Sequence, residues 1–337
     1  MSNWYLQSGK DSDVVISTRI RFARNLQEFK FTSRYNNIEA GEILERIKEI
    51  TPSIGYGLKF IRLKDIDDLN KISLVEKHII SPEFIKDDEN KAILINEEEN
   101  ICIMINEEDH LRMQFFTSGF DIESVYNLAK EVDEKINSLI NYAYDDKFGY
   151  LTSCPTNVGT GMRVSIMVHL PGLFLTKNIG KVFNIVSNFG MNVRGIYGEG
   201  TESQGDMYQI SNNQSLGLNE ESIIKNTKNI TERIIEQERA ARKILAKSNI
   251  ELEDRVYRAY GILSNAIKLS TEEARELLSD VKLGTDLGII KEVNDAKVAK
   301  MQLYIKPANL QLYTGKEMSK YERQIERSVI VKNIIKE

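Results

Sequence analysis

Apolar residues in the first two thirds of the chain come in short runs that have the length of β-strands. The runs KAILIN (91–96) and ICIMI (101–105) flank the polar stretch NEEEN, which predicts a hairpin of two antiparallel strands. The segment VVISTRIRFA (14–23) begins apolar and then alternates, so that Arg19 and Arg21 share one face and Ile20 lies on the other. Further strands are predicted at 149–153, 162–170, 192–198 and 206–212.

Helical periodicity lies between these runs. Helices are indicated at 38–50, 121–140 and 176–189, and Gly190 follows the last of them, where a helix C-terminus favours glycine. Strands joined by hairpins, with helices inserted between the pairs, predict an α+β domain whose antiparallel sheet is flanked by helices.

The pattern changes near residue 219, where a long, charged, amphipathic helix is predicted to begin. Two capping boxes of the form Ser-x-x-Glu, at 248–251 and 270–273, predict the starts of two more helices. The last ~90 residues carry almost only helical periodicity, apart from one possible short strand at 301–305. We therefore expect two domains, an α+β domain at 1–245 and an all-helical C-terminal domain at 246–337.

The composition is that of an ordinary soluble globular protein, with 337 residues, 41% hydrophobic and 28% charged. A net charge of −5 argues against general binding of nucleic acid, so we expect no direct nucleic-acid partner. Two cysteines, Cys102 and Cys154, are too few for a disulfide framework or a zinc cluster and suit a reducing cytosol. The sequence has neither an apolar signal core nor an apolar run of about 18 residues. We expect a cytoplasmic protein with no membrane association.

The most informative polar stretch is NEEDHLR (106–112), directly after the apolar run 101–105. Three carboxylates crowded at the end of a buried strand are costly unless cations lie beside them, although such a stretch is most often a solvated turn. Five arginines in or beside predicted strands change that picture, because the guanidinium fork matches phosphate oxygens bidentately. They are Arg19, Arg21, Arg112, Arg163 and Arg194. No G-x-x-x-x-G-K-[ST] motif is present, which excludes a P-loop mechanism.

Four separated motifs together resemble a known family, the phosphagen (guanidino) kinases. They are STRIRFARN at 17–25, NEEDHLRMQ at 106–114, CPTNVGTGMR at 154–163 and VRGIYGEGTES at 193–203, and the resemblance covers about residues 1–215. Two departures from the pattern of the phosphagen kinases narrow the resemblance to one group within the family. About 13 residues precede the first core strand, where phosphagen kinases for free creatine or arginine carry a helical domain that closes over the small substrate. The C-terminal helical extension is also absent from those enzymes, and both departures are those of the bacterial protein arginine kinases.

The resemblance implies a role for each candidate residue. The five arginines would clamp the phosphates of ATP. Glu108 would be the base that takes a proton from the target guanidinium, and Glu107 would hold hydrated Mg²⁺. Glu199 would be the second carboxylate that grips the guanidinium. Cys154 matches the reactive cysteine of the family, which lies beside the substrate, whereas Cys102 is expected in the core.

Two further sites rest on weaker matches. Met167 stands where relatives place a histidine against adenine, which implies apolar packing of the base, and His169, two residues later, is a weaker candidate for the adenine side of the site. The C-terminal Arg-Asp-x-x-Arg-Ala pattern of protein arginine kinases, which binds phosphoarginine, is matched by Arg323 and Arg327. Gln324 and Ser328 replace the Asp and the Ala. The alternative for the two arginines is a solvated basic face of a helix.

The resemblance therefore implies an ATP- and Mg²⁺-dependent kinase that phosphorylates arginine side chains in proteins. It also implies partners: protein substrates with exposed arginines, a Clp-type unfoldase and protease that degrade the marked proteins in stress and quality control, a heat-shock repressor, a zinc-finger activator protein and a second copy of the chain in a homodimer. Two alternatives stay open, a free-guanidino (arginine) phosphagen kinase and a catalytically inactive scaffold that binds phosphoarginine. A guanidinium pocket without the closing N-terminal domain favours a protein substrate over a free amino acid.

Overall fold

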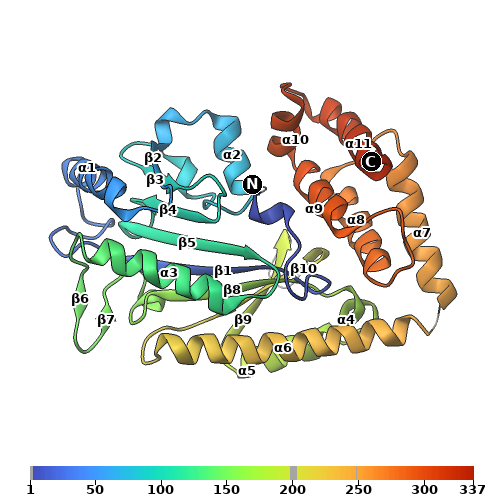
Figure 1. Ribbon diagram of the computed structural model, residues 1–337, viewed down its shortest axis with the longest axis horizontal. Helices are drawn as coiled ribbons and strands as arrows, with labels where there is room; N and C mark the ends of the chain where they lie inside the picture. The colour runs from blue at the N-terminus through green and yellow to red at the C-terminus, as the bar shows by residue number, and fades with distance from the viewer. Residues whose placement is uncertain (1–2, 198–202, 248) are drawn as a thin grey trace.

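The chain folds around a central antiparallel sheet in the computed structural model, which describes residues 3–197, 203–247 and 249–337 (Figure 1). Within these residues, eight strands form the sheet in the order β2-β3-β4-β5-β1-β8-β10-β9. These strands are β1 (Val15–Arg24), β2 (Lys59–Arg62), β3 (Ala92–Ile95), β4 (Ile101–Ile105), β5 (Leu111–Ser118), β8 (Met162–His169), β9 (Met191–Tyr197) and β10 (Ser203–Asn212). Two short strands, β6 (Tyr144–Asp145) and β7 (Gly149–Tyr150), pair beside the sheet.

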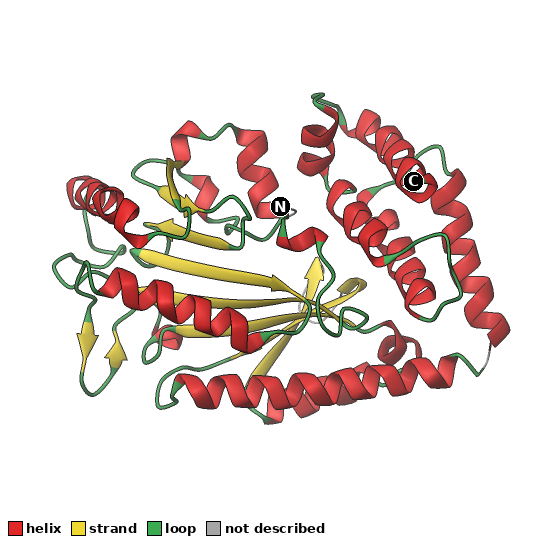
Figure 2. Ribbon diagram, viewed as in Figure 1, coloured by secondary structure: helices red, strands yellow, loops and turns green. Residues whose placement is uncertain are grey.

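Helices flank the sheet and make up the C-terminal part of the chain (Figure 2). The α-helices are α1 (Asn37–Ile54), α2 (Asp68–Glu76), α3 (Ile122–Asn137), α4 (Pro171–Leu175), α5 (Ile179–Asn188), α6 (Glu220–Leu245), α7 (Asn249–Asn265), α8 (Thr271–Asp286), α9 (Asp295–Tyr304), α10 (Pro307–Thr314) and α11 (Lys320–Lys336). Short 3₁₀ helices are η1 (Trp4–Leu6), η2 (Leu63–Asp65), η3 (Phe84–Lys86) and η4 (Pro155–Asn157). The predicted fold class, an antiparallel sheet with flanking helices followed by a helical region, is confirmed.

Alternation along the strands separates an apolar face of the sheet from a charged one. Ile20 and Phe22 of β1 are buried in a cluster that also contains side chains of α1, α3, α5 and α6. Arg19 and Arg21 therefore point to the opposite face, because successive side chains of a strand alternate. The burial of one apolar face against helices fixes the register and leaves the charged face for a ligand.

The helix ends follow the predicted signals where the structure describes them. Ser270 caps α8 in a full capping box with Glu273. Gly190 follows the C-cap residue of α5 with φ +70°, and its N–H donates to Ser187 O at 3.0 Å. Ser248 of the other predicted box lies outside the described residues.

Two predicted strands are wrong. The segment 301–305 belongs to α9, because Asn294 caps that helix and buried Val298, Met301 and Ile305 recur at helical spacing. The segment 149–153 pairs only at its first two residues, and it does so with β6 instead of the main sheet. There the Tyr150 N–H donates to Gly159 O at 2.8 Å, so the following loop folds back on the strand.

The C-terminal helices enclose a second hydrophobic cluster, separate from the one beneath the sheet. α8 packs against β10, and α10 packs against α2, so these helices stand beside one end of the sheet (Figure 1). The predicted domain division at residue 245 stays a prediction, and it falls at the last residue of α6. No helix in the described ranges is long and apolar enough to span a membrane.

Candidate active site

Three neighbouring strands place four of the predicted arginines on the charged face of the sheet. Arg21 of β1 lies opposite Arg163 of β8. On the other edge of β1, Ala23 lies opposite Arg112 of β5, and Ala23 shares its face with Arg21 and Arg19. Residues directly opposite each other in antiparallel strands point to the same side, so these four guanidinium groups rise from one surface.

The fifth arginine reaches the same surface from the edge of the sheet. Gln209 of β10 lies opposite Met167 of β8 on one side and opposite Arg194 of β9 on the other. Met167 shares its face with Arg163 four residues earlier. All five arginines predicted from the sequence therefore lie on one face. Arg194, on the edge strand, is the most exposed of the five.

Neutral side chains, not carboxylates, hold three of these arginines. The contacts are Arg19 Nη2 to Gln209 Oε1 at 2.9 Å, Arg21 Nη2 to Ser165 Oγ at 3.4 Å and Arg163 Nη2 to Ser211 Oγ at 3.5 Å. Among the ion pairs of the described residues, only Arg112 of the five meets a carboxylate, that of Glu107, at 2.7 Å. Among the described residues, the face thus carries more guanidinium groups than carboxylates that pair with them.

Burial and mutual repulsion disfavour the charged state of these groups. Burial, with the charges of Arg112 and Arg163, lowers the pKa of Arg19 to about 10. The pKa of Arg21 is also lowered, by burial and then by its arginine neighbours. The Nε atoms of Arg21 and Arg163 are buried without a hydrogen-bond acceptor in the described part of the chain. Buried donors of this kind are costly, and an anion with several oxygens would satisfy them and relieve the repulsion.

The acidic stretch after β4 presents two carboxylates with different environments. Glu107 Oε1 accepts from Arg112 Nη1 at 2.7 Å and from Ser81 Oγ at 2.6 Å, and Oε2 accepts the Glu108 N–H at 2.7 Å. Burial opposes ionisation of Glu107, but Arg112 outweighs it and the pKa is lowered. Glu108 is exposed, and its pKa is raised by burial of part of the group and by the charges of Asp109 and Glu107. Glu107 is therefore a fixed anion, whereas Glu108 is the better proton acceptor.

The remaining residues of this stretch hold the loop in place. Asp109 is buried and accepts from Asn25 Nδ2 and from the Ser153 N–H, both at 2.7 Å. His110 Nδ1 accepts the Leu26 N–H at 3.0 Å. Asp109 thus fixes the distance between the acidic stretch and the segment that carries Cys154.

Cys154 lies at the edge of the arginine face. Its side chain is half-buried and its Sγ lies 3.1 Å from Thr156 Oγ1. Burial, and then the charges of Arg194 and Arg112, lower the pKa of Arg163, and Glu108 acts in the opposite direction. Glu199, the second predicted carboxylate, lies outside the described residues. Cys102, a residue of β4, is fully buried, as expected for a core residue.

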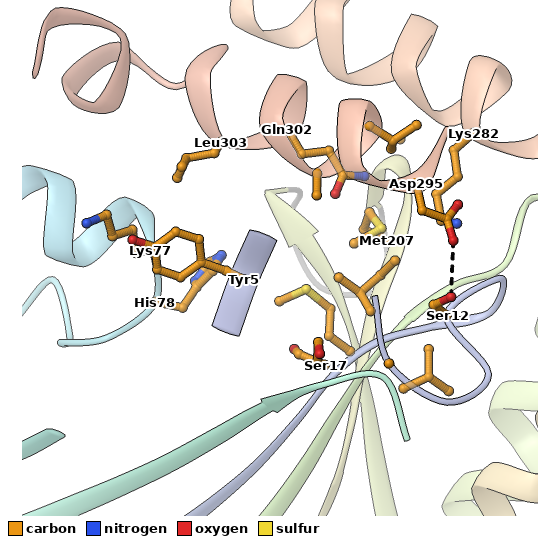
Figure 3. A pocket seen from close by; sticks show the side chains of 18 of the residues that line it. Tyr5, Ser12, Ser17, Lys77, His78, Met207, Lys282, Asp295, Gln302 and Leu303 are labelled. Atoms are coloured by element: carbon orange, nitrogen blue, oxygen red, sulfur yellow. Dashed lines mark hydrogen bonds between the residues drawn. The ribbon is translucent and has the colours of Figure 1, made fainter. Parts of the chain in front are cut away.

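A cavity adjoins the arginine face, between the sheet and the C-terminal helices (Figure 3). Met167 lines it together with Arg19, Ser165 and Gln209. The structure corrects the expectation for His169, which is buried under α8 and whose Nε2 lies 2.8 Å from Ser279 Oγ. β8 ends at His169, where α8 covers the sheet, so this ring belongs to the interface and not to the cavity lining.

Sequence reasoning missed the residues that other segments bring to this cavity. His78 lines it from the turn after α2, with φ +62°, and burial lowers the pKa of its ring far below the ordinary value. Tyr5 and Lys77 lie beside it, and both bind the Glu99 carboxylate, at 2.8 and 3.0 Å (Figure 3). No periodic pattern in the sequence marks Tyr5, Lys77 or His78 as lining residues. The chain has three histidines, and this rarity was the one signal that could have drawn attention to His78.

The two C-terminal arginines occupy different settings on α11. Arg327 is buried and donates to the backbone oxygens of Ile305 and Leu269, at 2.6 and 2.8 Å. Arg323 donates to Met318 O at 2.7 Å and lines a shallow surface pocket between α2 and the start of α11. The alternative of a solvated basic face therefore does not fit Arg327, which ties α11 to α9.

Comparison with known proteins gives matches over the whole chain. The family model described as ATP:guanido phosphotransferase, C-terminal catalytic domain, matches residues 42–241, and the one described as protein-arginine kinase McsB C-terminal domain matches residues 249–337. The protein-arginine kinase of Halothermothrix orenii is 46% identical over 334 residues, which cover 98% of this chain and 96% of that protein. The protein-arginine kinase of Clostridium tetani is 41% identical over 337 residues, which cover 100% and 99%.

Solved structures share the fold at lower identity. Lombricine kinase superposes with a TM-score of 0.60 at 24% identity, covering 68% of this chain and 67% of that one. The duplicated taurocyamine kinase of Schistosoma mansoni gives a TM-score of 0.62 at 24% identity, covering 80% and 40%. Full-length identity to curated relatives, matches to both family models and a guanidino-kinase fold agree with each other, and the chain belongs to the protein-arginine kinase family.

Proposed function

We propose that this protein transfers the γ-phosphoryl group of ATP to arginine side chains of other proteins. One observation carries the proposal: five arginines from four strands share one face of the sheet, and Glu108 directly follows Glu107, whose carboxylate binds Arg112 of that face. A positive surface next to a proton acceptor is what transfer between a triphosphate and a protonated guanidinium requires.

The arginine face would bind the phosphates of ATP. The buried Nε donors of Arg21 and Arg163 supply hydrogen bonds aimed at phosphate oxygens, and the repulsion among the guanidinium groups falls when an anion binds. Mg²⁺ would accompany the phosphates and neutralise their charge. Three hydrogen bonds occupy the Glu107 carboxylate, which accepts about four, so it has room to hold one water of the hydrated ion.

Glu108 would remove the proton that blocks the reaction. The pKa of a guanidinium exceeds 12, so its nitrogens are poor nucleophiles until a base accepts a proton. As that proton passes to Glu108, the freed nitrogen pair forms a bond to the γ-phosphorus and the bond to the ADP oxygen breaks. The arginine face holds ADP as it leaves, and the product carries a P–N bond. By the motif resemblance, Glu199 would be the second carboxylate that grips the guanidinium.

The cellular role that we propose follows from the family. Phosphoarginine would mark proteins for a Clp-type unfoldase and protease in the stress response, with a heat-shock repressor among the substrates, a zinc-finger protein as activator and a homodimer as the working form. The identities of the relatives support the activity, and these partners are part of the proposal.

A transfer assay tests the activity. Labelled ATP and Mg²⁺ are incubated with an unstructured arginine-rich protein or with free L-arginine, and the label is checked for loss in acid, where a P–N bond hydrolyses. We expect acid-labile label on the protein, abolished by Glu108→Gln. Glu97→Gln, an exposed carboxylate on the neighbouring β3–β4 turn, is the matched control and should retain activity.

Each contrary result has its own meaning. Label on free arginine alone would move the protein to the free-guanidino kinases. Full activity of Glu108→Gln would remove that residue from the role of base. A lack of transfer to either substrate, with a candidate activator present, would favour the phosphoarginine-binding scaffold.

A further inference from the structure

The cavity beside the arginine face is enclosed by both halves of the molecule (Figure 3). From the sheet, β8 and β10 contribute Met167 and Met207; from the C-terminal helices, α8 and α9 contribute Leu278, Val298 and Leu303. Its free volume is about 170 Å³. One water needs roughly 10–15 Å³ on the same measure, so the cavity is large enough for an organic ligand.

The charges around the cavity favour an anionic ligand. Five cations line it, namely Arg19, Lys77, Arg275, Lys282 and Lys306, and among the described lining residues Asp295 is the one carboxylate. Asp295 accepts hydrogen bonds from Ser8 and Ser12 at 3.2 and 3.3 Å, the second of which is drawn in Figure 3. Lys77 and Lys282 are paired with Glu99 and Asp286, which do not line the cavity. Arg19 supplies positive charge where the cavity meets the arginine face.

The cavity and the arginine face are parts of one site. Arg19 belongs to both, and Ser165 and Gln209, which hold the arginines in place, also line the cavity. A nucleotide with its phosphates on the arginine face would therefore extend its adenosine into the cavity. The apolar side chains of β8 and β10 lie on one side of that space, and those of α8 and α9 lie on the other.

We propose that α8 and α9 of the C-terminal region form one wall of the nucleotide site, with Gln302 of α9 contacting the adenosine. The proposal rests on the proposed use of ATP and adds that the helical region takes part in binding it. Gln302 points into the cavity, and within the described residues its amide has no protein partner (Figure 3). A side chain that can both donate and accept suits either the base or the ribose.

A substitution that fills the cavity from α9 tests this wall. Ala299 lines the cavity, whereas Ala296, one turn earlier on the same helix, is exposed and does not. Ala299→Phe would occupy the space of the adenosine, and Ala296→Phe places the same side chain in solvent as the matched control. The probes are a non-hydrolysable ATP analogue with Mg²⁺ and inorganic triphosphate with Mg²⁺, because the second needs only the arginine face.

The single tryptophan of the chain provides the readout. Trp4 lines the cavity and stacks on Phe116 with ring centroids 5.0 Å apart, so its fluorescence reports occupancy. We expect Ala299→Phe to lower the affinity for the ATP analogue about tenfold or more and to leave the affinity for triphosphate unchanged. Ala296→Phe should change neither affinity. Gln302→Ala, which removes atoms instead of adding them, should weaken the analogue about threefold to tenfold, as loss of one hydrogen bond does.

The outcomes separate this inference from the proposed function. Wild-type affinity for the analogue in both Ala299→Phe and Gln302→Ala would overturn the inference and leave the kinase standing. An equal loss of affinity for the analogue and for triphosphate in Gln302→Ala would also overturn the inference, because that pattern places the effect on the arginine face. If the wild-type protein binds neither probe, the proposed use of ATP fails first.

Discussion

Two arginines on β1, three positions apart, have opposite physical roles. Arg24 is fully buried, lies 2.7 Å from Asp133 and stacks 3.6 Å above the Tyr150 ring. Arg21 has arginine neighbours that disfavour its charge. One side chain stabilises the fold and the other is available to a ligand, although the sequence shows the same residue type at both positions.

This contrast predicts that the two arginines differ in their effect on stability. Arg24→Met should lower the free energy of unfolding by about 3–5 kcal/mol, because Asp133 is left buried without its partner. Arg21→Met should leave that free energy unchanged or raise it, and it should lower the affinity for nucleotide about tenfold or more. Urea denaturation and nucleotide titration of both variants measure the two effects. A similar loss of stability in the two variants would contradict the assignment.

Asp206 makes the free energy of unfolding depend on pH. It begins the part of β10 that α8 covers, Ser279 Oγ donates to it at 3.1 Å, and burial raises its pKa to about 6. In the unfolded chain an aspartate titrates near 3.9, so the folded state binds the proton more tightly. The contribution of Asp206 to the free energy of unfolding is therefore most favourable at low pH and is lost as pH rises from about 4 to 6.

The variant Asp206→Asn should remove this dependence. A pKa difference of about two units corresponds to about 3 kcal/mol. We expect the free energy of unfolding of the variant, minus that of the wild type, to increase by this amount between pH 4 and pH 6.5 and to stay level above it. Urea denaturation at half-unit steps measures the difference, and a value independent of pH would exclude Asp206 as its source.

At the scale of elements, a side chain from α2 caps a helix of the C-terminal region. Lys306, at the N-cap of α10, makes no side-chain capping bond. Instead, the Glu76 carboxylate accepts the N–H groups of Ala308 and Asn309 at 2.9 and 3.0 Å. A carboxylate at a helix N-terminus both pairs free N–H groups and opposes the helix dipole.

Removal of this cap should have a measurable cost. Glu76→Ala is expected to lower the free energy of unfolding by about 1–2 kcal/mol, because two buried N–H donors lose their acceptor. Glu83→Ala, an exposed carboxylate of the following turn, should change it by less than about 0.5 kcal/mol. Chemical denaturation compares the two. An effect of equal size in both would show that Glu76 acts by charge alone.

Sequence patterns predicted elements where local signals were complete. The hairpin at 91–105 and the helix start at Ser270 were found because the turn or cap lies within a few residues of the pattern it ends. The segment 301–305 was misread because five residues cannot distinguish a buried strand from a buried helix face. The Glu76 cap could not be predicted, since its donors lie more than 200 residues away.

The site was predictable to the same extent. Alternation placed Arg19 and Arg21 on one face, and the motif resemblance supplied the other members of the group. The cavity was not predictable, because η1, the turn after α2, α8 and α9 meet there only through packing of the C-terminal helices on the sheet. His169 was misplaced for the same reason: its position on β8 is on the correct face, but α8 covers it.

At the scale of the whole molecule, a buried charge network joins the C-terminal helices to the sheet. Arg242 of α6 donates to Glu238 at 2.6 Å, to Asp286 of α8 at 3.0 Å and to the backbone oxygen of Asp13 at 2.9 Å. Lys282, which lines the cavity, donates to the same Asp286 at 3.0 Å. The network therefore connects the two hydrophobic clusters next to the cavity.

Loss of Arg242 should uncouple the two parts of the molecule. Arg242→Met leaves Glu238 buried without a cation and Asp286 with Lys282 alone, so the free energy of unfolding should fall by about 3–5 kcal/mol. Because each part retains its own hydrophobic cluster, calorimetry should show one transition for the wild type and two for the variant. Arg258→Met, which breaks an exposed pair on α7, should keep one transition and cost at most about 0.5 kcal/mol. A single transition in Arg242→Met, shifted only in temperature, would mean that apolar packing between α8 and β10 couples the two parts without the network.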